Sequence, residues 1–337
     1  MSVEQAAERA PVPVPYARQA EPSASDGDDD GALPTSARPL LKAAADLVSL
    51  TKPRVTRMVV ATMLGGMWVA SRYLRSGLAG EAAMERAAVP ATQLLLALLG
   101  TVLVVSGANV LNMYIERDTD LLMERTRNRP LPARRLAPEV ALWFGIALSA
   151  TSIPLLFAWV NATTAALAAL ALLSYVLVYT PLKRRTTLAL PIGAIPGAIP
   201  PLLGWTSITG RIDAPGFLLF AVMFIWQIPH FLAIATFRRE EYQRAGLKVL
   251  PIEKGERTTR LHMVGYLALL VLASVLFVPL GVGGPVYLGA AIVLGGAFFG
   301  LGVRGLLAGA GDRWARKVFI ASMVYLVLLF AALMIGA

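Results

Sequence analysis

The sequence predicts an all-α, multi-pass membrane protein, a bundle of about nine transmembrane helices with a cytoplasmic N-terminus. Hydrophobic residues make up 56% of the chain and charged residues only 15%, which lies outside the range of soluble globular proteins. Long apolar segments recur, each near the ~20 residues that a helix needs to cross the hydrocarbon core of a membrane. Lysine and arginine gather in alternate loops, and the positive-inside rule places those loops in the cytoplasm.

The start of the chain differs in composition from the rest. We expect a disordered N-terminal tail over residues 1–45 and a transmembrane domain over residues 46–337, because Pro, Ala, Ser and Asp dominate the start. The tail lacks the apolar core of a signal peptide, and its excess of acids argues against a mitochondrial transit peptide. We therefore expect the protein to lie in a bacterial plasma (inner) membrane.

Charge and cysteine content exclude several classes of function. The net charge is +10, but no basic soluble domain accompanies it, so cations in cytoplasmic loops explain it better than binding to nucleic acid does. The chain has no cysteine, which excludes disulfides, thiolate metal sites and thiol catalysis.

Nine apolar segments are candidates for the crossings, with boundaries defined to within a few residues. They cover residues 55–70, 91–114, 139–159, 162–180, 188–208, 214–237, 261–281, 284–303 and 316–336. The two longest charged loops, residues 115–138 and 238–260, follow the second and sixth of these segments. With nine crossings both loops lie on the cytoplasmic face, where they can converge on one site.

The most informative segment is the end of the second apolar run, which continues into acids and arginines. Asn112, Glu116 and Asp120 are spaced four apart and share one face if the helix extends this far. Their oxygens suit a hard cation such as Mg²⁺, and the guanidinium groups that follow suit phosphoryl oxygens. The segment predicts a site for a metal-bound diphosphate; the alternative is a charged loop that only sets the topology.

Two more segments interrupt the apolar background. Lys183 and Arg184 follow the fourth crossing, where basic residues either bind an anion or anchor the helix at the membrane surface. Four prolines lie in the fifth crossing, from Pro191 to Pro201, and we expect them to break or kink that helix. Broken backbone at membrane depth lines a cavity in transporters and in intramembrane enzymes alike.

The sixth crossing and the loop after it carry a third group. Trp226, Gln227 and His230 lie within the crossing, where polar side chains are functional candidates. The alternative is that they only form hydrogen bonds to neighbouring helices. Glu240 and Glu241 follow at the cytoplasmic end and form a second acidic cluster. The last three crossings carry few polar residues, and we expect them to be scaffold.

These motifs resemble those of the UbiA-type intramembrane prenyltransferases. The run Asn112-x-x-x-Glu116-x-x-x-Asp120, followed by Arg125 and Arg129, is similar to their first signature. Other motifs resemble the branch of that superfamily that farnesylates protohaem. They are Leu50-Thr51-Lys52-Pro53-Arg54, Gly197-Ala-x-Pro200-Pro201-x-x-Gly204-Trp205, Trp226-Gln227-x-Pro229-His230-Phe231 and Leu250-Pro251.

Two positions depart from the superfamily pattern. Glu116 stands where the superfamily usually has Asp, which keeps the charge but lengthens the side chain by one methylene. Phe237 stands four residues before Glu241, where the superfamily often has a carboxylate, so Glu240 and Glu241 are the acids left in the second cluster.

The resemblance implies a Mg²⁺-dependent transferase that moves the farnesyl group of farnesyl diphosphate to a vinyl group of haem b, giving haem O and diphosphate. It assigns residues to three roles. The catalytic metal ligands are Asn112, Glu116 and Asp120. The diphosphate ligands are Lys52, Arg54, Arg125, Arg129, Lys183 and Arg184. The haem-binding residues are Trp226, Gln227 and His230. Membrane lipid surrounds the helices, and haem A synthase or a terminal oxidase assembly is the candidate protein partner.

Two alternatives stay open. A UbiA-type enzyme for another aromatic acceptor would share the diphosphate site but would need no histidine in the sixth crossing. A secondary transporter would use the proline-rich crossing at mid-membrane and predicts internal repeats, of which the sequence shows no convincing example. Both enzyme interpretations require Asp120 and Glu241 to lie on the same membrane face, above a hollow.

Overall fold

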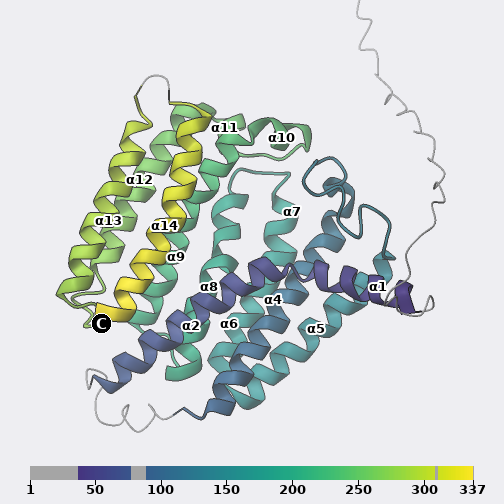
Figure 1. Cartoon of the computed structure of the whole chain (residues 1–337), viewed down its shortest axis with the longest axis horizontal. Coiled ribbons are helices and arrows are strands. Elements are labelled where there is room, and N and C mark those ends of the chain that lie inside the picture. The colour runs from purple at the N-terminus through teal and green to yellow at the C-terminus, as the bar shows by residue number, and fades with distance from the viewer. Residues whose placement is uncertain (1–36, 77–88, 308–309, 337) are drawn as a thin grey trace, which may run out of the picture. The chain divides into compact units, whose positions relative to one another are not determined.

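The structure is a computed structural model that describes residues 37–76, 89–307 and 310–336 (Figure 1). Residues 41–337 form one compact unit. The described part of the chain is helical and contains no β-strand, which confirms the predicted fold class. Most of the predicted disordered tail lies outside the described residues.

The helices follow the apolar segments of the sequence. Their bounds are α1 Ala37–Leu50, α2 Pro53–Arg75, α4 Ala91–Asp120, α5 Pro138–Trp159, α6 Ala162–Leu173, η2 Ser174–Tyr179, α7 Thr180–Leu182, α8 Ala189–Thr209, α9 Ala214–Phe237, α10 Arg239–Arg244, α11 Leu250–Glu253, α12 Gly255–Val275, α13 Pro285–Arg304 and α14 Asp312–Gly336. α12 begins and ends six residues earlier than predicted, because its first two turns carry the charged residues of the preceding loop.

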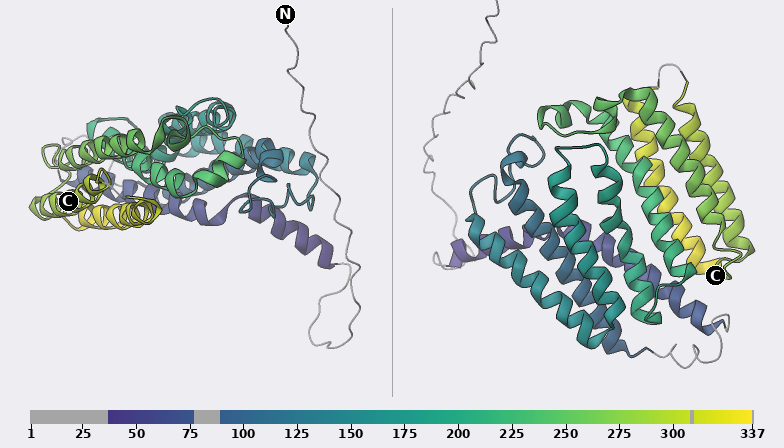
Figure 2. Two further views of the ribbon diagram at one scale, coloured as in Figure 1. Left: turned by 90° about the horizontal axis from the view of Figure 1, so that it is seen from above. Right: turned by 180° about the vertical axis from the view of Figure 1, so that it is seen from behind.

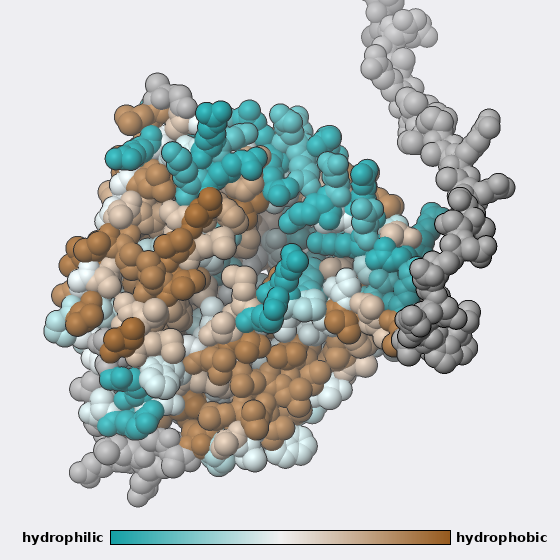
Figure 3. Space-filling model, in the orientation of Figure 1, coloured by the Kyte–Doolittle hydropathy of each residue, from teal (hydrophilic) through white to brown (hydrophobic). Residues whose placement is uncertain are grey.

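Seven helical segments of the described chain are long and apolar enough to cross a membrane: α4, α5, the continuous run from α6 to α7, α9, α12, α13 and α14. Helices α2 and α8 fall outside this set. The protein is therefore a multi-pass membrane protein, whereas the count of nine crossings and the side of the N-terminus stay predictions. Figure 3 shows hydrophobic side chains over α13 and α14 and over the lower ends of α5 and α6, as expected for lipid-facing surfaces.

The bundle is held together by a chain of helix pairs. α4 packs against α5, α2 against α8, and α8 against α9, which in turn contacts α12 and α14. The views in Figures 1 and 2 place the loop after α4, together with α10 and α11, at one end of the bundle. The two charged loops therefore lie at the same end of the unit, as the sequence predicts.

Helix α1 spans the predicted boundary between the tail and the transmembrane domain. It begins at Ala37, so the last residues assigned to the disordered tail are helical. The helix is amphipathic, and Leu47 and Leu50 on one face pack with Val110 and Met113 of α4. This apolar contact stabilises α1 although the residues before it are rich in Pro and Asp.

The proline-rich crossing is helix α8, which continues from Ala189 to Thr209 without a break. Pro196, Pro200 and Pro201 lie inside the helix and remove three backbone donors. Close packing against α2 and α9 holds the segment helical despite this loss. The predicted break is therefore absent, and the alternative, a kink, stays a prediction. The preceding crossing contains η2, a six-residue π-helix.

Helices α2 and α8 approach so closely that glycine is required on both sides. A Cβ atom on Gly66 would lie 2.0 Å from the carbonyl oxygen of Pro201, and a Cβ atom on Gly204 would lie 2.0 Å from that of Met63. Backbone atoms cannot move aside as a flexible side chain can. The contact positions the start of α2, and with it the segment that leads into the candidate site.

We predict that Gly204→Val separates α2 from α8 and destabilises the protein by about 1–3 kcal/mol, the usual cost of overpacking. Thermal unfolding in detergent measures the effect. Gly289→Val on α13 is the matched control, because a Cβ atom there meets nothing within 4 Å. Equal melting temperatures for the two variants would show that the close approach does not limit stability.

Candidate active site

Three side chains on the last turns of α4 form the centre of the site. Asn112 is 1% exposed and Asp120 is 4% exposed, and Glu116 lies between them on the same helix face. The structure therefore confirms that α4 extends past the apolar run and carries all three residues. Carboxylates buried this deeply need a cation or hydrogen-bond donors beside them.

Each of these side chains accepts a hydrogen bond from a cation in a different segment. The pairs are Lys52 Nζ to Asn112 Oδ1 at 3.2 Å, Lys183 Nζ to Glu116 Oε1 at 2.8 Å, and Arg129 Nη1 to Asp120 Oδ2 at 2.7 Å. We call these six residues the α4 cluster. Three of the six predicted diphosphate ligands thus lie in contact with the three predicted metal ligands.

Lys52 has an unusual backbone conformation. Its φ of 50° is left-handed although it is not glycine and stands directly before Pro53, so the surrounding structure must stabilise a strained geometry. Burial, together with the nearby charges of Arg129 and Lys183, lowers the pKa of Lys52 to about 7. Lys52 is therefore held close to other cations, an arrangement that an anion would stabilise.

The π-helix η2 and Thr180, the first residue of α7, supply further polar groups to the α4 cluster. Asn112 Nδ2 donates to Thr180 Oγ1 at 3.0 Å, and Tyr175 OH donates to Asn112 Oδ1 at 3.4 Å. The ring of Tyr179 stacks on Tyr175, and Lys183 Nζ lies 4.6 Å from the centre of the Tyr179 ring. π-Helical segments often occur at functional sites because they reposition side chains.

The sequence analysis did not identify Tyr175, Tyr179 or Thr180 as site residues. The available signal was the spacing of four between Tyr175, Tyr179 and Lys183, which places all three on one helix face. Burial lowers the pKa of Lys183, but the Tyr179 and Glu116 side chains more than offset this and raise it overall. Lys183 therefore stays charged beside Glu116.

The second acidic cluster lies beside the loop that follows α4. Arg238 Nη1 donates to Glu241 Oε2 at 2.8 Å, whereas Glu241 Oε1 is buried without a hydrogen-bond partner among the described residues. Both residues line a cavity of about 270 Å³ together with Glu124, Arg125 and Arg244. We call it the arginine cavity.

The arginine cavity adjoins the α4 cluster. The backbone N–H of Lys248 donates to the carbonyl oxygen of Lys183 at 3.1 Å, which ties the loop after α10 to the segment that carries Lys183. Burial raises the pKa of Tyr242, and the charges that act on it include Arg125 and Lys183. The two acid-and-arginine regions of the sequence therefore meet, and residues from both line one hollow.

The remaining predicted anion ligands lie apart from these contacts. Arg54 and Arg184 are exposed and form no hydrogen bond or ion pair with the described residues. Arg125 lines the arginine cavity and does not contact the α4 cluster directly. Glu240 is exposed and, unlike Glu241, does not line the cavity.

The predicted haem-binding residues face two different neighbours. Trp226 Nε1 donates to the carbonyl oxygen of Ser322 at 2.7 Å, and His230 Nδ1 lies 2.7 Å from Ser322 Oγ. Gln227 Nε2 donates to the carbonyl oxygen of Ala194 at 3.1 Å. Trp226 and His230 therefore face α14 and Gln227 faces α8. In the described structure these contacts join helices, and no sequence pattern points to Ser322.

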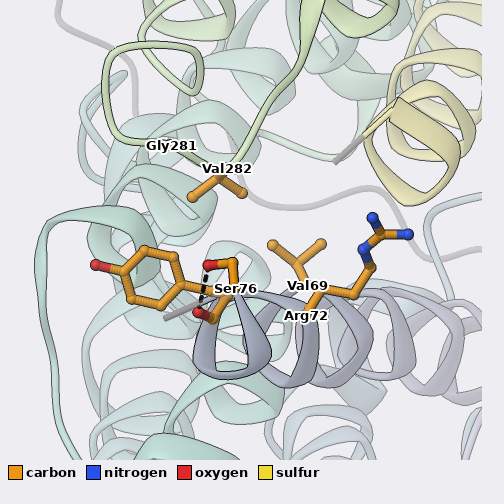
Figure 4. A pocket seen from close by; sticks show the side chains of 6 residues that line it. Val69, Arg72, Ser76, Gly281 and Val282 are labelled. Atoms are coloured by element: carbon orange, nitrogen blue, oxygen red, sulfur yellow. Dashed lines mark hydrogen bonds between the residues drawn. The ribbon is translucent and has the colours of Figure 1, made fainter. Parts of the chain in front are cut away.

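A second, smaller cavity of about 50 Å³ lies near the C-terminal end of α2 (Figure 4). Val69, Arg72 and Tyr73 line it, with Ser76 Oγ donating to the carbonyl oxygen of Tyr73 at 2.8 Å. No predicted site residue lines this cavity. It is too small for a prenyl chain or a porphyrin.

The loop that carries Arg129 is held in place by an ion pair with α1. Arg135 Nε and Nη2 donate to the carboxylate of Asp46 at 3.0–3.2 Å, and Arg135 Nη1 donates to the carbonyl oxygen of Asn128 at 3.0 Å. A two-pronged contact of this kind fixes orientation as well as distance. The Asp46–Arg135 pair therefore positions the loop without contacting the α4 cluster.

The fold and the site define a class of protein: a helical multi-pass membrane protein with buried acids and cations paired at one end. Residues 59–324 match the model of the UbiA prenyltransferase family, and the chain belongs to this family. The predicted resemblance is thereby confirmed.

Two relatives align with most of this chain. The chain is 86% identical over 280 residues to protoheme IX farnesyltransferase of Sorangium cellulosum (strain So ce56), covering 83% of this chain and 100% of the relative. It is 50% identical to protoheme IX farnesyltransferase of Myxococcus xanthus (strain DK1622), covering 86% of this chain and 94% of that relative.

Solved structures share the fold at low sequence identity. A structure of digeranylgeranylglyceryl phosphate synthase in membranes superposes with a TM-score of 0.73 at 17% identity, covering 87% of this chain and 98% of the other. A UbiA homolog from Archaeoglobus fulgidus bound to GPP and Mg²⁺ gives a TM-score of 0.55 at 17% identity, covering 86% and 99%. These likenesses show a common fold.

We predict that Asp46→Asn loosens the loop after α4. A hydrogen bond to a charged group contributes about 1.5–3 kcal/mol, and the partial exposure of Arg135 reduces this, so trypsin should cut at the loop arginines about tenfold faster. Limited proteolysis of the detergent-solubilised protein measures the rate. Asp213→Asn is the control, because its pair with the half-exposed Arg211 lies in a different loop. Cleavage of Asp46→Asn at the wild-type rate would contradict the positioning role.

Proposed function

We propose that the chain transfers the farnesyl group of farnesyl diphosphate to a vinyl group of haem b, with addition of one water molecule, to give haem O and diphosphate. The observation that carries this proposal is the α4 cluster, in which three oxygen side chains each accept a hydrogen bond from a cation of a separate segment. Membership of the UbiA prenyltransferase family and the 86% identity to a protoheme IX farnesyltransferase support it.

The donor set of the α4 cluster fits Mg²⁺. Asn112, Glu116 and Asp120 offer hard oxygen ligands from one helix face, although no group of three or more His, Cys, Asp or Glu side chains stands together among the described residues. The A. fulgidus homolog with GPP and Mg²⁺ supports a metal of this kind. When bound, Mg²⁺ supplies Lewis-acid stabilisation of the charge on the leaving diphosphate.

Ligand binding requires an exchange of partners within the α4 cluster. Without substrate, Lys183 and Arg129 pair with the carboxylates of Glu116 and Asp120, and Lys52 donates to the amide oxygen of Asn112. With a diphosphate present, Lys52, Arg129 and Lys183 turn to its oxygens and stabilise the charge that develops as the C–O bond breaks. The same movement frees Glu116 and Asp120 for the metal. Each carboxylate therefore has a cationic partner in both states.

The remaining chemistry needs little from protein acids or bases. Departure of diphosphate leaves an allylic farnesyl cation, the haem vinyl group attacks it, and water adds to the resulting cation and releases a proton. Water must not reach the farnesyl cation first, and an apolar helical interior provides that exclusion. This sequence of steps fits a cluster that contains cations and carboxylates but no histidine.

The proposal includes a location and partners. A bacterial inner membrane fits the multi-pass fold and the bacterial relatives, and it gives both apolar substrates access from the lipid. Haem A synthase or a terminal oxidase assembly is the proposed consumer of the product. Membership of a prenyltransferase family argues against the transporter alternative.

The purified protein with haem b, farnesyl diphosphate and Mg²⁺ should form haem O, detected by mass spectrometry. Glu116→Gln should lower kcat by about 10²–10³, because it removes a carboxylate ligand of the metal that stabilises the leaving diphosphate. The matched control is Glu139→Gln, at an exposed position near the start of α5 without an ion pair among the described residues. Wild-type turnover of Glu116→Gln would remove this residue from the proposed site.

The proposed contact between His230 and haem has its own test. His230→Ala should abolish turnover of haem b and leave diphosphate affinity unchanged, because the α4 cluster is intact. Ser322→Ala is the control: it removes the partner of Nδ1 and keeps the imidazole. Melting temperatures of both variants separate lost packing from lost binding. Unchanged turnover of His230→Ala would exclude haem contact at this position.

A further inference from the structure

We propose that the arginine cavity binds the two propionate carboxylates of the porphyrin acceptor, with Arg125 and Arg244 as the residues that contact them. The inference rests on the proposed function, because it names the part of haem b that this cavity receives. It assigns a role to Arg244, which lies outside the motifs of the sequence analysis. It also moves Arg125 from the diphosphate to the acceptor.

The ion pairs around the cavity show which of its charged groups are free to bind an anion. Arg238 is paired with Glu241 at 2.8 Å, and Glu124 lies 4.0 Å from Arg127. Both acids of the cavity are thus next to a cation of their own loop. These pairs leave the two remaining arginines as the groups that an incoming anion meets.

Arg125 and Arg244 have no ion-pair partner in the part of the chain that the structure describes. They come from the two charged loops, one after α4 and one at the end of α10, and they line the same cavity. Each guanidinium presents a planar set of donors that matches a carboxylate. Two unpaired positive charges on one cavity suit a ligand with two carboxylates.

The place of the cavity suits the shape of the acceptor. Haem b carries its propionates on one edge and its vinyl groups away from that edge, so a charged edge at the hydrophilic end of the bundle directs the vinyl groups inward. Figure 3 shows hydrophilic side chains gathered at the end that carries α10 and α11. Anchoring of the propionates there would orient a vinyl group towards the prenyl chain.

The diphosphate is the less suitable occupant of this cavity. The α4 cluster already offers it Lys52, Arg129 and Lys183, which are held against one another's charge. The backbone hydrogen bond from Lys248 to Lys183 ties the loop after α10, the helix that ends at Arg244, to the segment that carries Lys183. Two adjacent anion sites, one for each substrate, would bring the donor and the acceptor together while keeping their charges on separate cations.

The test compares haem b with its dimethyl ester, which has the same ring and vinyl groups but no carboxylate charge. For the wild-type protein, esterification should raise the KM of the acceptor about 10- to 100-fold, the effect of losing hydrogen bonds between charged groups. Arg244→Gln should raise the KM for haem b by a similar factor and leave the KM for the ester unchanged. The KM for farnesyl diphosphate should stay within about twofold of wild type.

Arg125→Gln should behave as Arg244→Gln does, and Arg257→Gln is the matched control. Arg257 is exposed on α12 and forms no ion pair with the described residues, but it does not line the cavity, so both acceptors should keep their wild-type KM.

Three results would overturn the proposal. An increase in the KM for farnesyl diphosphate alone would assign the cavity to the diphosphate. Equal losses with haem b and its ester would exclude recognition of the propionates, as would wild-type kinetics of Arg244→Gln. Each of these results leaves the proposed function standing, because the wild-type protein still farnesylates haem. Absence of a farnesylated product from the wild-type protein would instead refute the proposed function.

Discussion

The structure depends on the pairing of buried charges at one end of an apolar bundle. Glu116 and Asp120 lie at the end of a membrane-crossing helix, where an unpaired carboxylate would be costly. Lys183 and Arg129 neutralise them, and these cations arrive on a different helix and on a loop. The ends of three chain segments are thereby fixed relative to one another. Because the site contains both cations and carboxylates, it suits a ligand that itself carries positive and negative charge, as a metal diphosphate does.

Contacts outside the α4 cluster hold its residues in position. The close approach of α2 and α8 positions the start of α2, where Lys52 lies, and the Asp46–Arg135 pair positions the loop that carries Arg129. The π-helix η2 places Tyr175 on Asn112, and the start of α7 places Thr180 there. None of these supports takes part in the proposed chemistry. Each limits the movement of a residue that does, so that partners can be exchanged without collapse of the site.

Much of the fold could be predicted because apolar length is a local property. A run such as Ala214–Phe237 must be helical in a bilayer, since its backbone groups have no other partners there. The spacing of Asn112, Glu116 and Asp120 likewise follows from the helical period alone. The proline-rich crossing is the opposite case: whether α8 stays continuous depends on packing against α2 and α9, which no local pattern describes.

The sequence by itself determined the membrane class, the approximate helix boundaries and the shared face of the α4 acids, because composition and periodicity are properties of the chain alone. Only the tertiary structure decided which cation pairs with which acid, that Arg125 lies with Arg244 and not with the α4 cluster, and that Ser322 faces His230. These are contacts between segments far apart along the chain. Their geometry depends on how helices cross and loops fold back, and no local pattern of residues reveals it.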